Sequence, residues 1–103
     1  MNETYTPPEK IQYWNVCYWA ENQGMLLGSR KIKAKNFLQE GCIQKINETE
    51  FRCKPIEGYN KTTHKIIRGN GWKCTCQFNQ KVGKECSHIL ACKLFNFMEE
   101  WNK

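Results

Sequence analysis

The fold is decided by residues 72–92, which read WKCTCQFNQKVGKECSHILAC. Within this stretch, Cys74, Cys76, Cys86 and His88 have the spacing C-x-C-x9-C-x-H. Three thiols and one imidazole complete the four-ligand shell of a structural zinc ion and leave no position for water. The pattern therefore predicts one structural Zn²⁺ as the cofactor, and it argues against a metal-based catalyst.

The residues around these four ligands are compatible with a shared site. Side chains two apart on an extended strand point to the same face, so the C-x-C pair can bind one ion. In front of it, residues 69–71 (Gly-Asn-Gly) contain the Asn-Gly pair that is typical of tight hairpin turns. The third cysteine and the histidine stand where an apolar run of helical period begins, which predicts a helix over about 87–101. We expect the metal to hold the hairpin against this helix, with Trp72 packed beside it.

The rest of the chain predicts helices first and strands afterwards. A capping-box pattern starting at Thr6 predicts a helix to about Asn22, and a second helix is expected through Phe37 and Leu38 to a stop at Gly41. Strands are predicted over 43–46, 51–56, 62–68 and 72–76, followed by a polar knuckle over 77–85 that turns at Gly83.

These elements predict an α+β fold. We expect a small antiparallel β-sheet with a ββα zinc-finger unit and one or two N-terminal helices. The expected division is residues 1–29 as an aromatic helix and linker and residues 30–103 as the zinc-binding domain, whose zinc core is 72–101. A chain of 103 residues has a marginal core, so the metal is expected to supply part of the folding free energy.

The first predicted helix is rich in aromatic residues. Ile11, Trp14 and Tyr18 share one face, for which core packing is the simplest explanation. Tyr13 and Trp19 lie off that face. They are candidates for a surface that docks a protein partner or stacks on nucleic-acid bases.

Seven cysteines are an odd number, and the C-x-C and C-x-H pairs favour reduced thiols and a metal site over a disulfide framework. The four cysteines outside the motif, Cys17, Cys42, Cys53 and Cys92, are expected to be small buried hydrophobes. His64 stands alone on a predicted strand and is interpreted as a solvated or hydrogen-bonded histidine.

The net charge favours an anionic partner, although it also serves solubility. Lys and Arg number 16 against 10 acidic residues, which gives a formal charge of +6. The residues predicted to contact nucleic-acid phosphates are Arg30, Lys31, Lys33, Lys35, Lys73, Lys81 and Lys84. No apolar run has the length of a membrane span, and the polar start MNETYTPPEK lacks a signal-peptide core. We therefore expect an intracellular protein (cytoplasm and nucleoid, or nucleus) without a membrane partner or a small-molecule substrate.

The segments 72–78 (WKCTCQF) and 85–92 (ECSHILAC) resemble the SWIM zinc finger, whose signature is C-x-C-x(n)-C-x-H. Trp72 stands two residues before the first cysteine and the Ile-Leu-Ala run follows the histidine, as is common in that family. Ser87 departs from the basic residue often found between the last two ligands. The resemblance covers roughly residues 34–97. It implies a ββα zinc unit of the kind found in transposases, chromatin remodellers and recombination accessory proteins, with roles in DNA binding and protein contact.

Two functional hypotheses follow, and neither is an enzyme, because the chain offers no Gly-rich phosphate loop or free Cys/His pair for nucleophilic chemistry. The first is a non-catalytic nucleic-acid-binding module, with DNA expected before RNA and with contacts mostly to the phosphate backbone. The alternative is an accessory subunit of a larger nucleic-acid-processing or ribosome-linked assembly, docked through the aromatic N-terminal helix.

Overall fold

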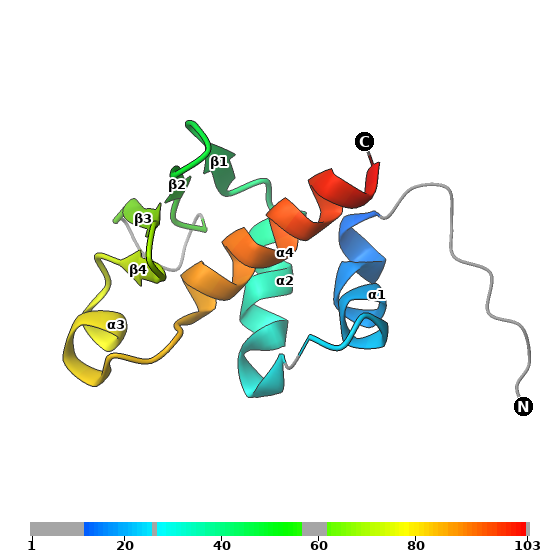
Figure 1. Ribbon diagram of the computed structural model, residues 1–103, viewed down its shortest axis with the longest axis horizontal. Coiled ribbons are helices and arrows are strands. Elements are labelled where there is room, and N and C mark those ends of the chain that lie inside the picture. Colours follow the sequence, from blue (N-terminus) through cyan, green and yellow to red (C-terminus); the bar gives the residue numbers. More distant parts are fainter. Residues whose placement is uncertain (1–11, 26, 57–61, 103) are drawn as a thin grey trace, which may run out of the picture.

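The chain combines four α-helices with one four-stranded sheet in a computed structural model that describes residues 12–25, 27–56 and 62–102 (Figure 1). The order is a 3₁₀ turn η1 (Tyr13–Asn15), α1 (Val16–Asn22), a 3₁₀ turn η2 (Gly28–Arg30), α2 (Lys31–Gln39), β1 (Ile43–Lys45), β2 (Glu50–Cys53), β3 (His64–Arg68), β4 (Trp72–Cys74), α3 (Gln77–Val82) and α4 (Ser87–Asn102). The predicted α+β class is confirmed.

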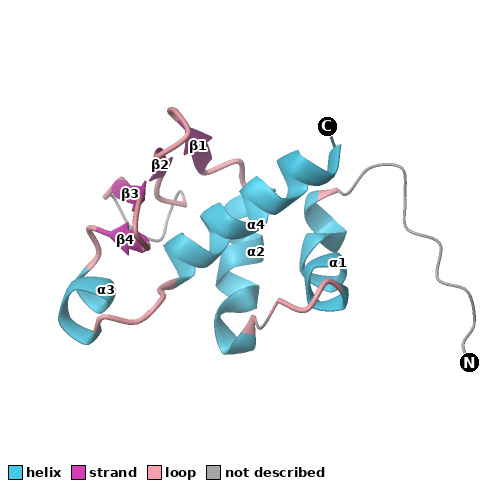
Figure 2. Ribbon diagram, in the orientation of Figure 1, coloured by secondary structure: helices cyan, strands magenta, loops and turns pink. Residues whose placement is uncertain are grey.

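The sheet is an antiparallel meander in which each strand pairs with the next one in the chain, β1-β2-β3-β4 (Figure 2). The predicted turn at residues 69–71 joins β3 to β4, and it is closed by a hydrogen bond from the Gly69 N–H to the Gly71 carbonyl. The turn between β1 and β2 is closed by Asn47, whose side-chain oxygen accepts from the N–H groups of Thr49 and Glu50. Short local turns thus join β1 to β2 and β3 to β4.

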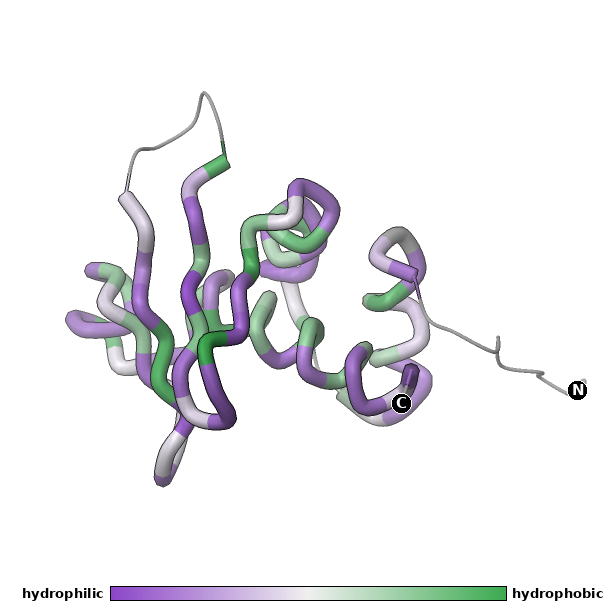
Figure 3. The backbone as a smooth tube through the Cα atoms, turned by 90° about the horizontal axis from the view of Figure 1, so that it is seen from above, coloured by the Kyte–Doolittle hydropathy of each residue, from purple (hydrophilic) through white to green (hydrophobic). Residues whose placement is uncertain are grey.

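One face of the sheet is buried. Alternate residues on β2 to β4 point inward, and Phe51, Ile66 and Cys74 are all less than 5% exposed. The same alternation leaves Arg52, Lys65 and Lys73 on the opposite, exposed face. Seen from above, the strands stand toward one end, with α1 and α2 toward the other (Figure 3).

Helix α4 is the element around which the core is built. It packs chiefly on α2 and also contacts α1 and all four strands. Its buried residues are Ile89, Leu90, Ala91, Cys92, Leu94 and Met98. A single cluster of buried side chains reaches from α1 to α4 and includes residues on both sides of the predicted boundary at 29/30. The division into two parts stays a prediction.

The first helix differs from its prediction. The proposed start at Thr6 lies outside the described residues, and α1 begins only at Val16, after a 3₁₀ turn. The buried residues of α1 are Val16, Trp19 and Ala20, which stand at the helical spacing i, i+3 and i+4. Trp19 is therefore buried at 7% exposure, whereas Tyr18 is 57% exposed and Tyr13 40%. The expectation that Trp19 lies off the packed face was wrong, and so was the assignment of Tyr18 to the core.

The segment after β4 also differs from its prediction. Residues 77–82 form the short helix α3 instead of an irregular knuckle. The predicted turn at Gly83 is confirmed, because this residue ends α3 with a φ of 76°, a left-handed conformation that favours glycine. Among the described residues, no helix has both the length and the apolar character needed to cross a bilayer.

Candidate metal centre

The four ligands predicted from the sequence come together in space. One donor atom from each of Cys74, Cys76, Cys86 and His88 lies within 4.8 Å of every other. Cys74 comes from the end of β4, Cys76 caps α3, and the last two flank the start of α4 at Ser87. The three cysteines are buried and the histidine is partly buried. This cluster can hold a metal ion.

The distances inside the cluster suit a tetrahedral ion. The His88 Nδ1 atom lies 3.8 Å from the Cys74 sulfur and 3.7 Å from the Cys86 sulfur. A tetrahedral Zn²⁺ with ordinary zinc–sulfur and zinc–nitrogen bond lengths places these atoms about 3.6 Å apart. These two nitrogen–sulfur distances are thus within about 0.2 Å of the tetrahedral value, and Nδ1 is the histidine atom that faces the sulfurs.

Each of the three sulfurs also accepts a backbone hydrogen bond. The Cys76 N–H donates to the Cys74 sulfur (3.4 Å), the Asn79 N–H to the Cys76 sulfur (3.4 Å) and the Ile89 N–H to the Cys86 sulfur (3.5 Å). Hydrogen bonds to a charged ligand stabilise its charged form. The backbone is therefore arranged to stabilise thiolates, the form that binds metal.

The pKa values of the three thiols are shifted in opposite directions. The pKa of Cys86 is lowered to about 3, first of all by the side-chain hydrogen bond with Cys74. The same hydrogen bond raises the pKa of Cys74, and burial raises that of Cys76. Without a metal, one thiolate is stabilised by neighbouring thiols that keep their protons. A bound cation would replace those protons and allow all three sulfurs to be charged.

Asn79 connects the parts of the site, and the sequence analysis did not identify it. Its side-chain oxygen accepts from the Cys74 N–H (2.9 Å), and its side-chain nitrogen donates to the Lys84 carbonyl (2.8 Å). One amide thus joins the end of β4 to the loop before Cys86. The only sequence signal for it is an Asn three residues after a helix-capping position.

Two rings hold the imidazole of His88 in place. The Phe37 ring on α2 lies 5.1 Å from it and the His64 ring on β3 lies 4.4 Å from it, measured between ring centroids. His64 Nδ1 is also 3.5 Å from the Thr75 hydroxyl, which agrees with the prediction of a hydrogen-bonded histidine. Its pKa is lowered, mainly by burial and also by the neighbouring His88. Trp72, in contrast, packs on Phe51, with ring centroids 5.4 Å apart.

Three of the four remaining cysteines are buried as predicted. Cys42, Cys53 and Cys92 are at most 5% exposed, whereas Cys17 is half-buried and packs at the edge of the core. Burial raises the pKa of Cys92 to about 12 and also raises that of Cys53. These thiols stay protonated at neutral pH and take no part in the cluster.

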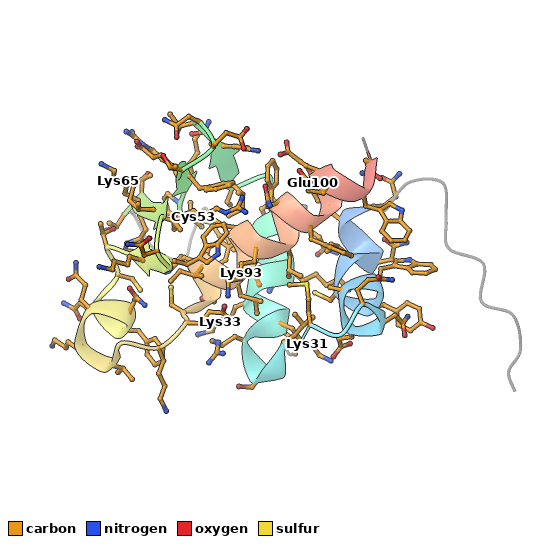
Figure 4. All side chains as sticks on the ribbon, in the orientation of Figure 1. Lys31, Lys33, Cys53, Lys65, Lys93 and Glu100 are labelled. Carbon is orange, nitrogen blue, oxygen red and sulfur yellow. The ribbon has the colours of Figure 1, made fainter. Side chains whose placement is uncertain are left out.

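The basic segment at the start of α2 is split between two sides of the helix. Lys31 pairs with Glu21 on α1, with 3.2 Å between the charged atoms, and the Lys35 charge acts on the Cys17 thiol on the same side. Arg30 and Lys33 instead border a hollow beside the metal cluster. Figure 4 shows Lys31 and Lys33 on opposite sides of α2. The four residues do not form one patch.

Lys73, Lys81 and Lys84 are exposed, on β4, on α3 and just after it. Lys73 borders a cavity of about 550 Å³ between the β3–β4 hairpin and α3. The polar part of its lining comes from Lys65, Lys73, Thr75, Asn79 and Gln80, and none of its lining residues is acidic. Lys65 was not among the predicted contact residues, although its position opposite Thr75 places it on the same face as Lys73.

No protein-family model, curated protein or solved structure matches this chain, so the metal centre is described from its own geometry alone.

Proposed function

We propose that this chain is a non-catalytic, zinc-stabilised module that binds nucleic acid, DNA in preference to RNA, mostly through the phosphate backbone. The observation that carries the proposal is the cavity between the β3–β4 hairpin and α3. It presents Lys65 and Lys73 together with amide and hydroxyl groups beside the apolar side chains of Ile67 and Trp72, and no carboxylate lines it. Such a surface complements phosphates and offers little that distinguishes one base from another.

Zinc is the metal that suits this ligand set. Three thiolates and one imidazole in a closed tetrahedral arrangement are typical of structural zinc sites. With its four ligands supplied by the protein, the ion has no open position for a substrate, which supports a structural role. The spacing C-x-C-x9-C-x-H and the strand–helix placement of the ligands support assignment to the SWIM type of zinc finger.

The test is a salt series with the zinc-loaded protein and labelled DNA, followed by fluorescence anisotropy. Phosphate binding should weaken by about 0.9 log unit per log unit of salt for each phosphate contacted on duplex DNA. The double variant Lys65→Glu/Lys73→Glu should bind at least roughly tenfold more weakly and show a shallower salt slope. Each single variant, Lys65→Glu and Lys73→Glu, is compared with Lys54→Glu, which makes the same charge change at an exposed lysine that lines neither hollow beside α3 and should have a much smaller effect. Absence of DNA and RNA binding at low salt would refute the proposal.

A protein-docking role is the second candidate, and the exposure of Tyr13 and Tyr18 favours it. These two rings lie on or next to α1, on the far side of α2 from the metal cluster, and both are exposed. Trp19, which the sequence also predicts for this surface, is buried in the core and is no part of it. An interface of this kind should respond little to salt, and Tyr13→Ala/Tyr18→Ala should abolish it without changing DNA affinity.

A further inference from the structure

A second hollow lies on the other side of α3, beside the metal cluster. It has a volume of about 420 Å³ and is bordered by Arg30 and Lys33 from the start of α2, by Phe78 from α3, and by Ser87 and His88 from the start of α4. Both hollows combine basic side chains with an aromatic ring, but the ring in the cavity next to β4, Trp72, is partly buried and packs on Phe51, whereas Phe78 is exposed.

Phe78 is an exposed aromatic residue beside basic side chains. Its side chain is 45% exposed, and no residue of α3 is buried. The phenyl ring is therefore left open at the rim of the hollow instead of being packed in the core. The flat face of such a ring is the surface on which nucleic-acid bases stack, and stacking tolerates any base.

The charges in the hollow favour a neutral base at one position and phosphates at another. Lys33 is exposed, and Arg30 makes a long ion pair, 3.8 Å, with Glu85, whose carboxylate also pairs with Lys93. A zinc ion with three thiolates carries a net charge of about −1, which disfavours a phosphate directly over the ligands. A neutral base fits beside Phe78, while Arg30 and Lys33 at the rim suit the phosphates next to it.

Resting on the proposed function, we infer that the module binds single-stranded nucleic acid, with one base stacked on Phe78 and adjacent phosphates held by Arg30 and Lys33. In a duplex the bases are already stacked on each other, so Phe78 gains a partner only when the strand is single. The cavity next to β4 supplies backbone contacts that duplex and single strand share. Single-strand preference therefore comes from Phe78.

The experiment compares Phe78→Leu with Val82→Ala in the zinc-loaded protein. Leu keeps the apolar bulk but removes the flat ring, and Val82 is an exposed apolar residue on the same short helix, 52% exposed, that does not line the hollow. Probes are labelled (dT)20, (rU)20 and a mixed 20-base-pair duplex at one low salt concentration, and zinc content is measured for each protein. Phe78→Leu should weaken binding to the single strands by roughly 5- to 150-fold. It should leave duplex affinity unchanged, and Val82→Ala should resemble the wild type with every probe.

A second variant tests the stacking directly. Phe78→Trp should bind single strands at least as well as the wild type, and its additional tryptophan fluorescence should be quenched by (dT)20. The inference is overturned if Phe78→Leu changes no affinity, if it weakens single strands and duplex equally, or if the new tryptophan is not quenched. Wild-type binding to duplex alone would also overturn it while leaving the proposed function intact, whereas binding to none of the three probes would overturn both. The (dT)20 and (rU)20 arms show whether the single strand is DNA or RNA.

Discussion

Helices α3 and α4 follow each other in the chain, yet they are held in place by different means. The six residues of α3 include no buried residue, and its order depends on Cys76 at its start, on Asn79 and on the turn at Gly83. Helix α4 has sixteen residues and buries six of them against α2, the sheet and α1. An isolated six-residue helix is unstable in water, so the metal region (residues 72–88) needs its ligands, whereas α4 is stabilised by apolar packing.

The largest effect should come from removing a ligand. Cys86→Ser removes one of the four donors of the metal. Metal binding contributes on the order of 10 kcal/mol to folding, which is as much as the whole stability of most small domains, so its loss should unfold the metal region. We expect loss of zinc by atomic absorption and loss of the cooperative thermal transition. Cys17→Ser makes the same chemical change outside the cluster and should keep both. A Cys86→Ser protein that retained one zinc and an unchanged midpoint would contradict the four-ligand site.

Leu94→Ala tests the other side of the comparison. Leu94 is fully buried on α4, and truncating a buried leucine costs about 2–5 kcal/mol through lost transfer energy and a cavity. Urea unfolding should show this loss while zinc content stays at one per chain. Ile32→Ala, at a site 67% exposed, should change stability by less than about 0.5 kcal/mol. Loss of zinc in Leu94→Ala would show that the metal region depends on the packing of α4 as well as on its ligands.

Asn79→Ala should have an intermediate effect that is confined to the metal region. It leaves the Cys74 N–H and the Lys84 carbonyl without their side-chain partner, which costs about 1–3 kcal/mol where the groups are buried. Zinc transfer to a chromogenic chelator should become faster, because outer hydrogen bonds position the ligands. Gln80→Ala, at the next and exposed position, is the control. Equal zinc-transfer rates for the two variants would show that Asn79 does not position the metal ligands.

The smallest expected effect is a pH dependence of the folding stability that comes from Cys92 on α4. Burial raises the pKa of Cys92 from 9.0 to about 12, so the folded chain keeps this proton where the unfolded chain has lost it. The stability that Cys92 contributes is complete below about pH 9 and is lost as pH rises toward 12. Between pH 8 and pH 10 the wild type should lose about 1 kcal/mol more free energy of unfolding than Cys92→Ala, measured by urea titration. An equal loss in the two proteins would show that Cys92 is accessible or already ionised.

The sequence was sufficient for features that depend on local chemistry. The four ligands, the turn at residues 69–71 and the start of α4 each follow from residue types at fixed spacing, and the structure brings them together as predicted. The orientation of Tyr18 and Trp19 did not follow, because this segment is apolar on more than one side. The stripe that packs is Val16, Trp19 and Ala20, and periodicity alone does not choose it over the stripe that contains Tyr18.

Two other features could not be read from the sequence. Helix α3 has no core-facing side, so hydrophobic periodicity gives no signal for it. The split of the basic segment depends on tertiary neighbours: Lys31 turns to Glu21 on α1, whereas Lys33 faces the hollow beside Phe78. Charge clusters along a chain and charge clusters on a surface are separate properties.

The meander order of the sheet has a consequence for how the chain folds as it is synthesised. Each strand meets the strand made just before it, and the first and last ligands are only 14 positions apart. Closing so short a loop loses little chain entropy, and contacts that are local in sequence form quickly. The sheet can therefore be complete when Cys86 and His88 leave the ribosome, so that metal capture becomes a late, fast step that requires no distant segment of the chain.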